Sequence, residues 1–155
     1  VIEEEEIEKK TQSLGITPYE ALIIASLIEE EAQLAKERPM ISRVIYNRLQ
    51  RGWRLGIDAT SRYAVGKTAG QELSIEDLEY DSPWNTRVSL GLPPTAISAP
   101  GRASIQAALN PVKGEWLYYV RTDQNGVIGA HTFAITSEDF EKARKICVNK
   151  DLGCG

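Results

Sequence analysis

The chain has 155 residues, of which 42% are hydrophobic and 26% are charged, and its net charge is −4 with a pI near 5.1. This composition excludes a disordered chain and a coiled coil, and it fits one globular domain that buries a core. Nucleic acid is not an expected partner, because Lys and Arg are scattered along an acidic chain. No apolar run approaches the length of a membrane span, and no signal-peptide pattern is present.

The first residues predict a lead-in helix. The segment from Ile2 to Leu14 is acidic and moderately amphipathic, and Gly15 closes it. The sequence begins at Val1 without a methionine, so we expect residues 1–16 to lead in from an N-terminal anchor or module that this sequence lacks. Residues 17–155 are expected to form one domain.

The most strongly specified helix runs from Thr17 to Gln33, with the sequence TPYEALIIASLIEEEAQ. Thr17 can cap it, and Glu20 three residues later completes a capping box worth about 1 kcal/mol. Between Ala21 and Ile28 every residue except Ser26 is apolar. The helix is therefore predicted to be buried nearly all round along these two turns.

Three glutamates follow this apolar run directly. At about 100° per residue, Glu29 and Glu31 continue different apolar faces of the helix, whereas Glu30 points between them. Burial on such a face raises the pKa of a carboxyl group toward the range of a general acid. Periodicity does not choose between Glu29 and Glu31, and the alternative is that all three mark the emergence of the helix into solvent.

Later segments predict five more helices and one hairpin. The helices begin and end at residues that favour helix termini, and they are Pro39–Leu49 with a stop at Gly52, a helical turn through Ser61–Val65 with Asp58 as its cap, Ser74–Leu78, Arg102–Leu109 and Glu138–Val148. Strands are predicted at Glu115–Thr122 and Val127–Ile135, with a turn at Asp123–Gly126. Helices come first and the hairpin late, so we predict an α+β fold: a helical core with a late antiparallel β-hairpin.

Two cysteines, Cys147 and Cys154, lie close together in the tail. They could close a small loop or remain free thiols. The spacing alone does not identify a metal site, because the single histidine, His131, would have to be a distant third ligand. We expect neither a metal nor a cofactor. A disulfide would indicate an oxidising, extracytoplasmic compartment.

An ordered set of motifs resembles one enzyme family. The set consists of IASLIEEE at 24–31, VIYNRL at 44–49, LGID at 55–58 with Tyr63 and Gly66, Asn85-Thr86, GLPP at 91–94, APG at 99–101 and GAHTF at 129–133. No single motif is decisive, but the order is specific. Over about residues 18–133 the chain resembles the catalytic domain of an endolytic murein transglycosylase.

The resemblance implies a setting and a reaction. The family is anchored in the bacterial inner membrane and cuts nascent peptidoglycan glycan strands outside the cytoplasm, so this piece is expected to be the soluble catalytic domain. Cell-wall synthases, the penicillin-binding proteins, are expected partners. The implied compartment and the closeness of the two cysteines together predict a Cys147–Cys154 disulfide.

The family's catalytic acid follows the apolar run directly, and that position here is Glu29. Glu31 and Arg48 then become candidates for supporting the catalytic residue. One carboxyl group suffices for this reaction: it protonates the glycosidic oxygen, then accepts the proton of the muramyl C6 hydroxyl, which attacks C1 and leaves a 1,6-anhydro end. Substrate binding is predicted for polar and aromatic residues in the matched motifs, namely Asn47, Asp58, Tyr63, Asn85, Thr86 and His131.

Each of these residues also has a structural interpretation. Asn47 and Arg48 can tie down a helix end, Asp58 can be only a cap, and His131 can be a satisfied structural histidine. Two departures from the family pattern concern Trp84, where tyrosine is usual, and the region of Asp139 and Phe140, where a common histidine is missing.

The segment Ser82–Gly101 is long and rich in Pro, Gly, Ser and Thr. Long structured loops are usually functional, so we predict that it forms one wall of the cleft, with Trp84 and Asn85 in it. Replacement of Asn85 is accordingly expected to reduce activity more than stability.

Two other functions remain open. One is a lysozyme-like muramidase that uses Glu29 with Asp58 or Glu31 as its second carboxylate. The other is a glycan-binding or synthase-docking module without catalysis.

Overall fold

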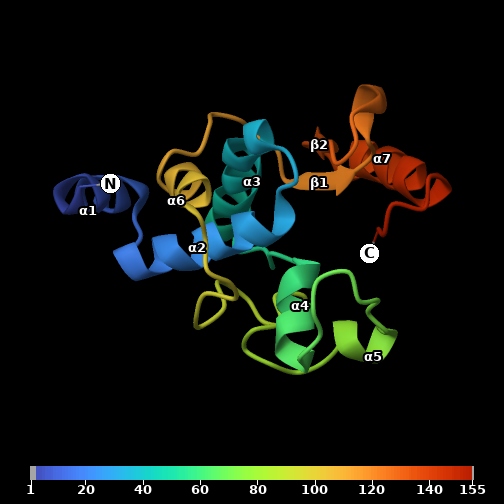
Figure 1. Cartoon of the computed structure of the whole chain (residues 1–155), viewed down its shortest axis with the longest axis horizontal. Helices are drawn as coiled ribbons and strands as arrows, with labels where there is room; N and C mark the ends of the chain where they lie inside the picture. Colours follow the sequence, from blue (N-terminus) through green and yellow to red (C-terminus); the bar gives the residue numbers. More distant parts are fainter. Residues whose placement is uncertain (1–2, 155) are drawn as a thin grey trace.

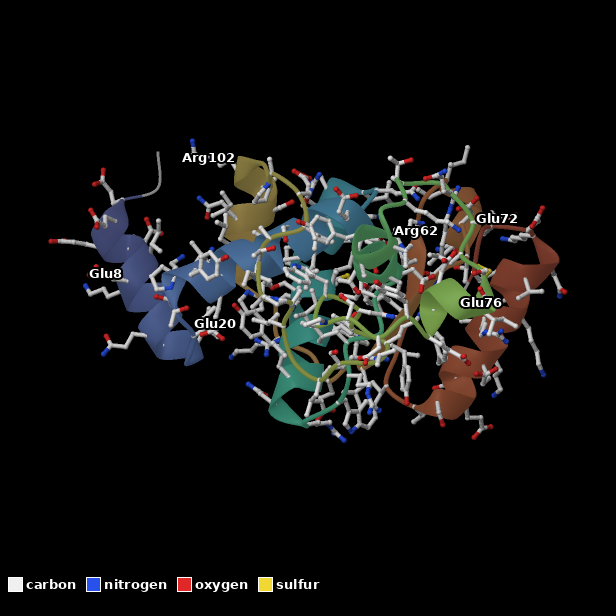
Figure 2. The ribbon with its side chains drawn as sticks, turned by 90° about the horizontal axis from the view of Figure 1, so that it is seen from below. Glu8, Glu20, Arg62, Glu72, Glu76 and Arg102 are labelled. Carbon is white, nitrogen blue, oxygen red and sulfur yellow. A yellow bond between two sulfur atoms is a disulfide. The ribbon has the colours of Figure 1, made fainter. Side chains whose placement is uncertain are left out.

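The computed structural model describes residues 3–154 (Figure 1). This part of the chain contains seven α-helices, two short 3₁₀ helices and one β-hairpin, which are joined by loops. In chain order the elements are α1 Glu4–Leu14, α2 Pro18–Glu31, η1 Ala35–Glu37, α3 Arg38–Gln50, α4 Asp58–Val65, α5 Ile75–Leu78, α6 Arg102–Leu109, β1 Tyr118–Arg121, η2 Gln124–Gly126, β2 His131–Ala134 and α7 Ser137–Asn149. Helices α1 and α7 lie at opposite ends of the long axis, and the charged side chains of Glu8, Glu72 and Arg102 point outward (Figure 2).

Helix α2 is the centre of the core. Its predicted capping box is present, because Thr17 Oγ1 accepts the Glu20 amide at 3.1 Å and Glu20 Oε1 accepts the Thr17 amide at 3.0 Å. Every residue of Ala21–Ile28 except Leu22 is buried. Helices α3 and α6 pack against it. Burial of these apolar side chains is the main force that holds the helices together.

Helix α1 precedes this core and packs on α2 and α6. The predicted helix began at Ile2, which lies outside the described residues, and it ends as predicted at Gly15, whose φ is +72°. Within residues 3–154 no helix is both long enough and apolar enough to cross a membrane.

The late hairpin confirms the α+β prediction. Strands β1 and β2 pair antiparallel, with Tyr119 opposite Phe133 and Arg121 opposite His131. They are shorter than predicted, and the chain between them passes through left-handed conformations at Asp123 and Asn125. Helix α7 covers the hairpin, and the ring of Phe140 stacks on Tyr118 at 4.9 Å.

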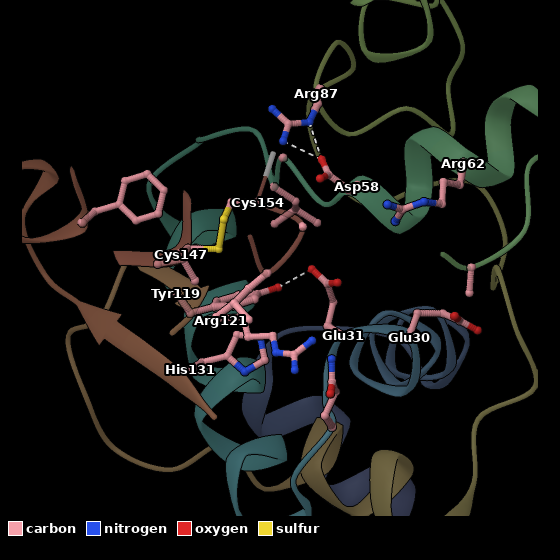
Figure 3. A pocket seen from close by; sticks show the side chains of 18 of the residues that line it. Glu30, Glu31, Asp58, Arg62, Arg87, Tyr119, Arg121, His131, Cys147 and Cys154 are labelled. Atoms are coloured by element: carbon pink, nitrogen blue, oxygen red, sulfur yellow. Dashed lines mark hydrogen bonds and ion pairs between the residues drawn. A yellow bond between two sulfur atoms is a disulfide. The ribbon is translucent and has the colours of Figure 1, made fainter. Parts of the chain in front are cut away.

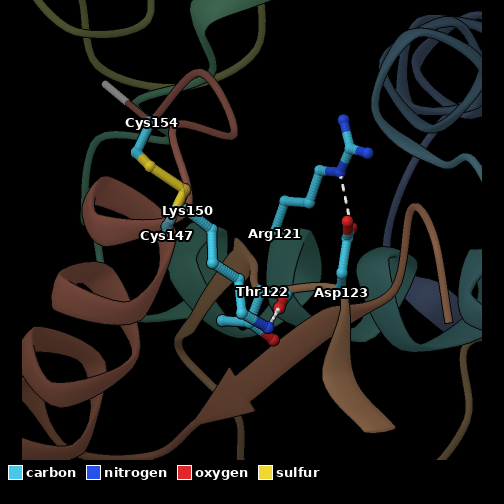
Figure 4. The surroundings of a disulfide bond; sticks show 6 residues. All are labelled: Arg121, Thr122, Asp123, Cys147, Lys150 and Cys154. Atoms are coloured by element: carbon cyan, nitrogen blue, oxygen red, sulfur yellow. Dashed lines mark hydrogen bonds and ion pairs between the residues drawn. A yellow bond between two sulfur atoms is a disulfide. The ribbon is translucent and has the colours of Figure 1, made fainter. Parts of the chain in front are cut away.

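The predicted disulfide between Cys147 and Cys154 is present, with 6.1 Å between the Cα atoms. It fixes the C-terminal tail to α7 (Figure 4). Lys150 Nζ adds a hydrogen bond to the Thr122 carbonyl at 2.7 Å, so the same region is also joined to the hairpin.

One cap prediction was wrong. The residue that caps α4 is Ile57, whose side chain cannot accept a hydrogen bond, and Asp58 is the first helical residue. Its carboxylate is instead used by Arg87, whose Nε donates to Asp58 Oδ1 at 2.7 Å. An acidic residue in the first turn still opposes the positive end of the helix dipole.

Residues 82–101 form a loop that is anchored along its length. Near its end the Ile97 amide donates to Ser26 Oγ at 3.1 Å and Ser98 Oγ donates to the Ser26 carbonyl at 3.1 Å. Ser26, the one polar residue of the apolar run, therefore attaches this loop to the core helix.

Candidate active site

A cavity of about 400 Å³ lies where several elements meet around the C-terminal end of α2 (Figure 3). Its walls come from α2, α4, both strands and the disulfide-bonded tail. Most of the side chains that surround it are charged or polar, including Glu31, Asp58, Arg62, Arg87, Tyr119, Arg121 and His131.

Glu31 is the carboxyl group held at the centre of this cavity. Tyr119 Oη donates to Glu31 Oε1 at 2.7 Å (Figure 3). Burial raises the pKa of Glu31 from 4.5 to about 7, although the Tyr119 hydrogen bond works against this rise. The negative charge of Asp58 raises this pKa further and the positive charge of Arg62 lowers it. A carboxyl group with a pKa near 7 can both donate and accept a proton at neutral pH.

Glu29 has a different environment, on the side of α2 that faces α6. The Gly101 amide donates to Glu29 Oε1 at 2.6 Å, and Ser104 Oγ donates to Glu29 Oε2 at 3.3 Å. Gly101 is the N-cap residue of α6, and it has no side chain to cap that helix. Glu29 supplies the missing acceptor from a neighbouring helix. It does not line the cavity.

The approach of Glu29 to α6 explains the glycine at position 101. A Cβ atom on Gly101 would lie 3.1 Å from Glu29 Oε1, which is tighter than an ordinary contact. The APG motif at 99–101 therefore brings a bare backbone N–H up to the carboxylate.

Asp58 and Arg48 both line the cavity. Asp58 is held by Arg87 in an ion pair. Arg48 donates to the carbonyls of Leu117, Arg54 and Leu55 at 2.6, 3.0 and 3.2 Å. These bonds join the end of α3 to the strand region and show that much of the guanidinium group holds backbone in place.

His131 also lines the cavity, although only 8% of it is exposed. Its Nδ1 lies 2.9 Å from Glu37 Oε1. Glu37 is itself buried, at 5% exposure, and sequence analysis did not identify it. The imidazole ring meets the ring of Tyr119 edge-on, with 5.5 Å between the centroids.

Asn85 and Thr86 lie away from the cavity and are bonded inside the protein. Asn85 has no exposed surface; its Oδ1 accepts from Ser61 Oγ at 2.8 Å, and its Nδ2 donates to the Tyr80 carbonyl at 2.8 Å. Thr86 Oγ1 accepts the Ile57 amide at 2.9 Å. Their side chains hold the long loop to α4 and to the segment before it.

Asn47 and Tyr63 also lie outside this cavity. Asn47 Nδ2 donates to the carbonyls of Gly114 and Trp116 at 3.1 and 2.9 Å, which ties the end of α3 to the chain before β1. Tyr63 is 46% exposed, and its ring lies 6.3 Å from that of Trp84. It lines a neighbouring cavity of about 260 Å³ together with Glu30 and Arg62.

The long loop contributes one residue, Arg87, to the main cavity and Ile97 to the neighbouring one. Tyr119, Arg62, Arg87 and Arg121 were missed at the sequence level. The sequence held a signal for two of them. Tyr119 and Arg121 are two positions apart in a predicted strand, so they share one face of it, and Arg121 pairs with the candidate His131.

Comparison with known proteins connects this chain to one group of bacterial proteins. The profile of the YceG-like family matches residues 1–146. The chain is 38% identical over 130 residues to the endolytic murein transglycosylase of Bacillus subtilis and 33% identical over 146 residues to that of Streptococcus pneumoniae. These alignments cover 84% and 91% of this chain but only 35% and 26% of the two relatives.

A crystal structure of a yceG-like protein from Listeria monocytogenes has the same fold. The TM-score is 0.79 at 36% identity, and the match covers 89% of this chain and 44% of that protein.

Proposed function

The chain belongs to the YceG-like family, and on that premise we propose that it is an endolytic lytic transglycosylase that cuts peptidoglycan glycan strands and leaves 1,6-anhydro-muramic acid ends. The names of its relatives support the substrate and the activity. Cutting within a nascent strand would limit its length.

The observation that carries this proposal is the partly buried carboxyl group of Glu31, which lines a polar cavity, accepts a hydrogen bond from Tyr119 and has a pKa near 7. We assign the role of the acid to Glu31. This replaces the assignment of Glu29 that the family resemblance suggested, because both oxygens of Glu29 accept hydrogen bonds at the start of α6. At about 100° per residue the two side chains lie about 160° apart around the helix, so they face nearly opposite sides, and only Glu31 lines the cavity.

The reaction then needs one carboxyl group. Protonated Glu31 donates its proton to the oxygen that links N-acetylmuramic acid to the next sugar, and the bond from C1 to that oxygen breaks. The Glu31 carboxylate next accepts the proton of the muramyl C6 hydroxyl while O6 bonds to C1. Glu31 ends protonated as it began, and no water is consumed. A partly buried setting both raises its pKa and limits hydrolysis.

Neighbouring residues support these steps. Tyr119 holds the Glu31 carboxyl group by its hydrogen bond, and the positive charges of Arg62, Arg87 and Arg121 surround the cavity. Asp58 is paired with Arg87, so we assign it to the cavity wall and to substrate contact. This pairing disfavours the muramidase alternative, in which Asp58 would activate water as a second carboxylate.

For substrate binding we retain His131 and Asp58, which line the main cavity, with Arg48 as support. Tyr63 is a candidate for contact with a sugar in the neighbouring cavity. We assign structural roles to Asn47, Asn85 and Thr86, because their side chains are bonded within the protein.

We further propose an extracytoplasmic setting, which the disulfide favours because such bonds persist in oxidising compartments. Docking to a penicillin-binding protein and anchoring by a membrane helix come from the family resemblance and remain part of the same proposal.

The function is tested by incubating the protein with uncrosslinked glycan strands and recording a mass spectrum of the products. Shortened strands with 1,6-anhydro ends support the proposal. Shortened strands with reducing ends would show a muramidase, and strands that are bound but uncut would show a binding module.

A further inference from the structure

Glu37 is a buried carboxyl group that the proposed reaction does not use. It ends η1, directly before α3, and both of its oxygens are engaged by one residue. Glu37 Oε2 accepts the backbone amide of His131 at 2.9 Å, and Glu37 Oε1 lies 2.9 Å from Nδ1 of the same residue. The two residues are 94 positions apart in the chain.

The Glu37–His131 pair is connected to Glu31, the proposed acid, through the side chain of Tyr119. The imidazole of His131 meets the ring of Tyr119 edge-on, with an interplanar angle of 76°. The hydroxyl group of Tyr119 donates to Glu31. A continuous series of contacts therefore runs from Glu37 through His131 and Tyr119 to Glu31, and its last three members line the same cavity (Figure 3).

The pair also fixes the position of the histidine proton. A carboxylate has only acceptors, so the hydrogen bond at Nδ1 requires Nδ1–H. In a neutral imidazole the other nitrogen, Nε2, then carries a lone pair. Since His131 lines the cavity, Nε2 is the ring nitrogen left for a ligand, and it suits a donor such as a sugar hydroxyl.

We infer that Glu37 is a positioning residue for this site: it holds His131 as the Nδ1–H tautomer, so that the ring keeps Tyr119 against Glu31 and Nε2 accepts a hydrogen bond from a hydroxyl group of the bound strand. The inference rests on the proposed function and deepens it. Glu37 itself does not touch the substrate.

The first test reads the tautomer directly and requires no substrate. His131 is the only histidine in the chain, so ¹⁵N NMR of the imidazole nitrogens reports on this ring alone. The neutral ring of the wild type is expected to carry its proton on Nδ1. A neutral ring protonated at Nε2 would overturn the inference, whatever the enzyme activity proves to be.

The second test measures how Glu37→Gln and Tyr119→Phe combine. We expect Glu37→Gln to remain folded and to lower kcat by roughly 10² at most, because a small displacement of a catalytic group has an effect of this order. Its effect should be much smaller in the Tyr119→Phe background, since both changes loosen the same contact with Glu31. Glu20→Gln, at the far end of α2, is the matched control and should keep wild-type kcat.

Wild-type kcat in a folded Glu37→Gln variant, or losses that simply multiply in the double variant, would contradict the inference. If Glu37→Gln does not fold, His131→Asn replaces it: this variant keeps a donor toward Glu37 and removes Nε2, so it should raise KM. An unchanged KM in folded His131→Asn would likewise contradict the inference. Failure of the wild type to form 1,6-anhydro ends would instead refute the proposed function.

Discussion

Two glutamates separated by one residue on helix α2 have opposite environments. Glu29 accepts hydrogen bonds from Gly101 and Ser104 at the start of α6, whereas Glu31 shares one hydrogen bond with Tyr119 inside a cavity. Desolvation disfavours the charged form of a carboxyl group, and this is the first cause of the raised pKa of Glu31. The desolvated setting of Glu31 suits a proton donor. The setting of Glu29 suits a hydrogen-bond acceptor for the free amides at the start of α6.

The raised pKa of Glu31 predicts how activity depends on pH. The acid must be protonated when the substrate arrives, and its pKa of about 7 places the loss of that proton near neutrality. The rate kcat/KM should therefore fall as the pH rises through about 7. A profile of kcat/KM from pH 5 to 9 on glycan strands checks this. A rate that stays constant up to pH 9 would contradict a single acid with this pKa.

The same pKa predicts that Glu31→Gln stabilises the protein at high pH. The folded state holds the Glu31 proton up to about pH 7, whereas the unfolded chain releases it near 4.5, so between these values the folded state binds more protons. The free energy of unfolding therefore falls as pH rises through this window, and Gln does not titrate.

Urea unfolding at pH 4 and pH 8 tests this. From pH 4 to pH 8, the free energy of unfolding of Glu31→Gln should rise relative to that of wild type by on the order of 1 to 3 kcal/mol. The exposed variant Glu8→Gln should gain nothing. A Glu31→Gln variant that loses stability at pH 8 would show that the carboxylate is stabilised in the folded state.

At the scale of elements, Glu29 acts as a cap from a neighbouring helix. Glu29→Ala removes both acceptors at the start of α6, so it should lower the free energy of unfolding by about 1 to 2 kcal/mol. Activity measured below the unfolding transition should remain near that of wild type. Thermal unfolding and product release together check this. An inactive variant of unchanged stability would return the catalytic role to Glu29.

The long loop is held by a buried amide. Asn85→Ala would leave Ser61 Oγ and the carbonyls of Leu78 and Tyr80 without their partner, at about 1 to 3 kcal/mol for each buried group left unpaired. We therefore expect a large fall in the unfolding midpoint and near-normal activity in the folded protein. This reverses the expectation drawn from sequence. Urea unfolding and kcat of Asn85→Ala distinguish a structural role from a binding role. Lost activity at wild-type stability would indicate that Asn85 contacts the substrate.

Local signals in the sequence predicted the elements well. The capping box at Thr17 and Glu20 and the bounds of α6 are confirmed, because caps and apolar spacing act over a few residues. The site was harder to predict. Tyr119 reaches Glu31 across 88 residues of chain, and no local pattern in either segment reports on that contact. The burial of Asn85 could not be predicted either, because a buried amide and a sugar-binding amide look alike in sequence.

At the scale of the whole molecule, α2 joins the core to the cavity. Its apolar turns pack against α3 and α6, and its last turn carries Glu31 to the place where α4, the hairpin and the tail meet. The tail is held there by the Cys147–Cys154 disulfide, and Cys154 lines the cavity. Rigid elements on several sides would keep the proposed catalytic carboxyl group in place.

A comparison of Glu31→Gln and Glu29→Gln on the same uncrosslinked glycan strands shows which carboxyl group is the acid. Glutamine keeps the shape of each side chain and removes the transferable proton. The mass spectrum of the products should show 1,6-anhydro ends for wild type and for Glu29→Gln, and a loss of at least about 10² in rate for Glu31→Gln, which should still bind the strands. Near wild-type release of 1,6-anhydro ends by Glu31→Gln, with none from a folded Glu29→Gln, would show that Glu29 and not Glu31 is the acid.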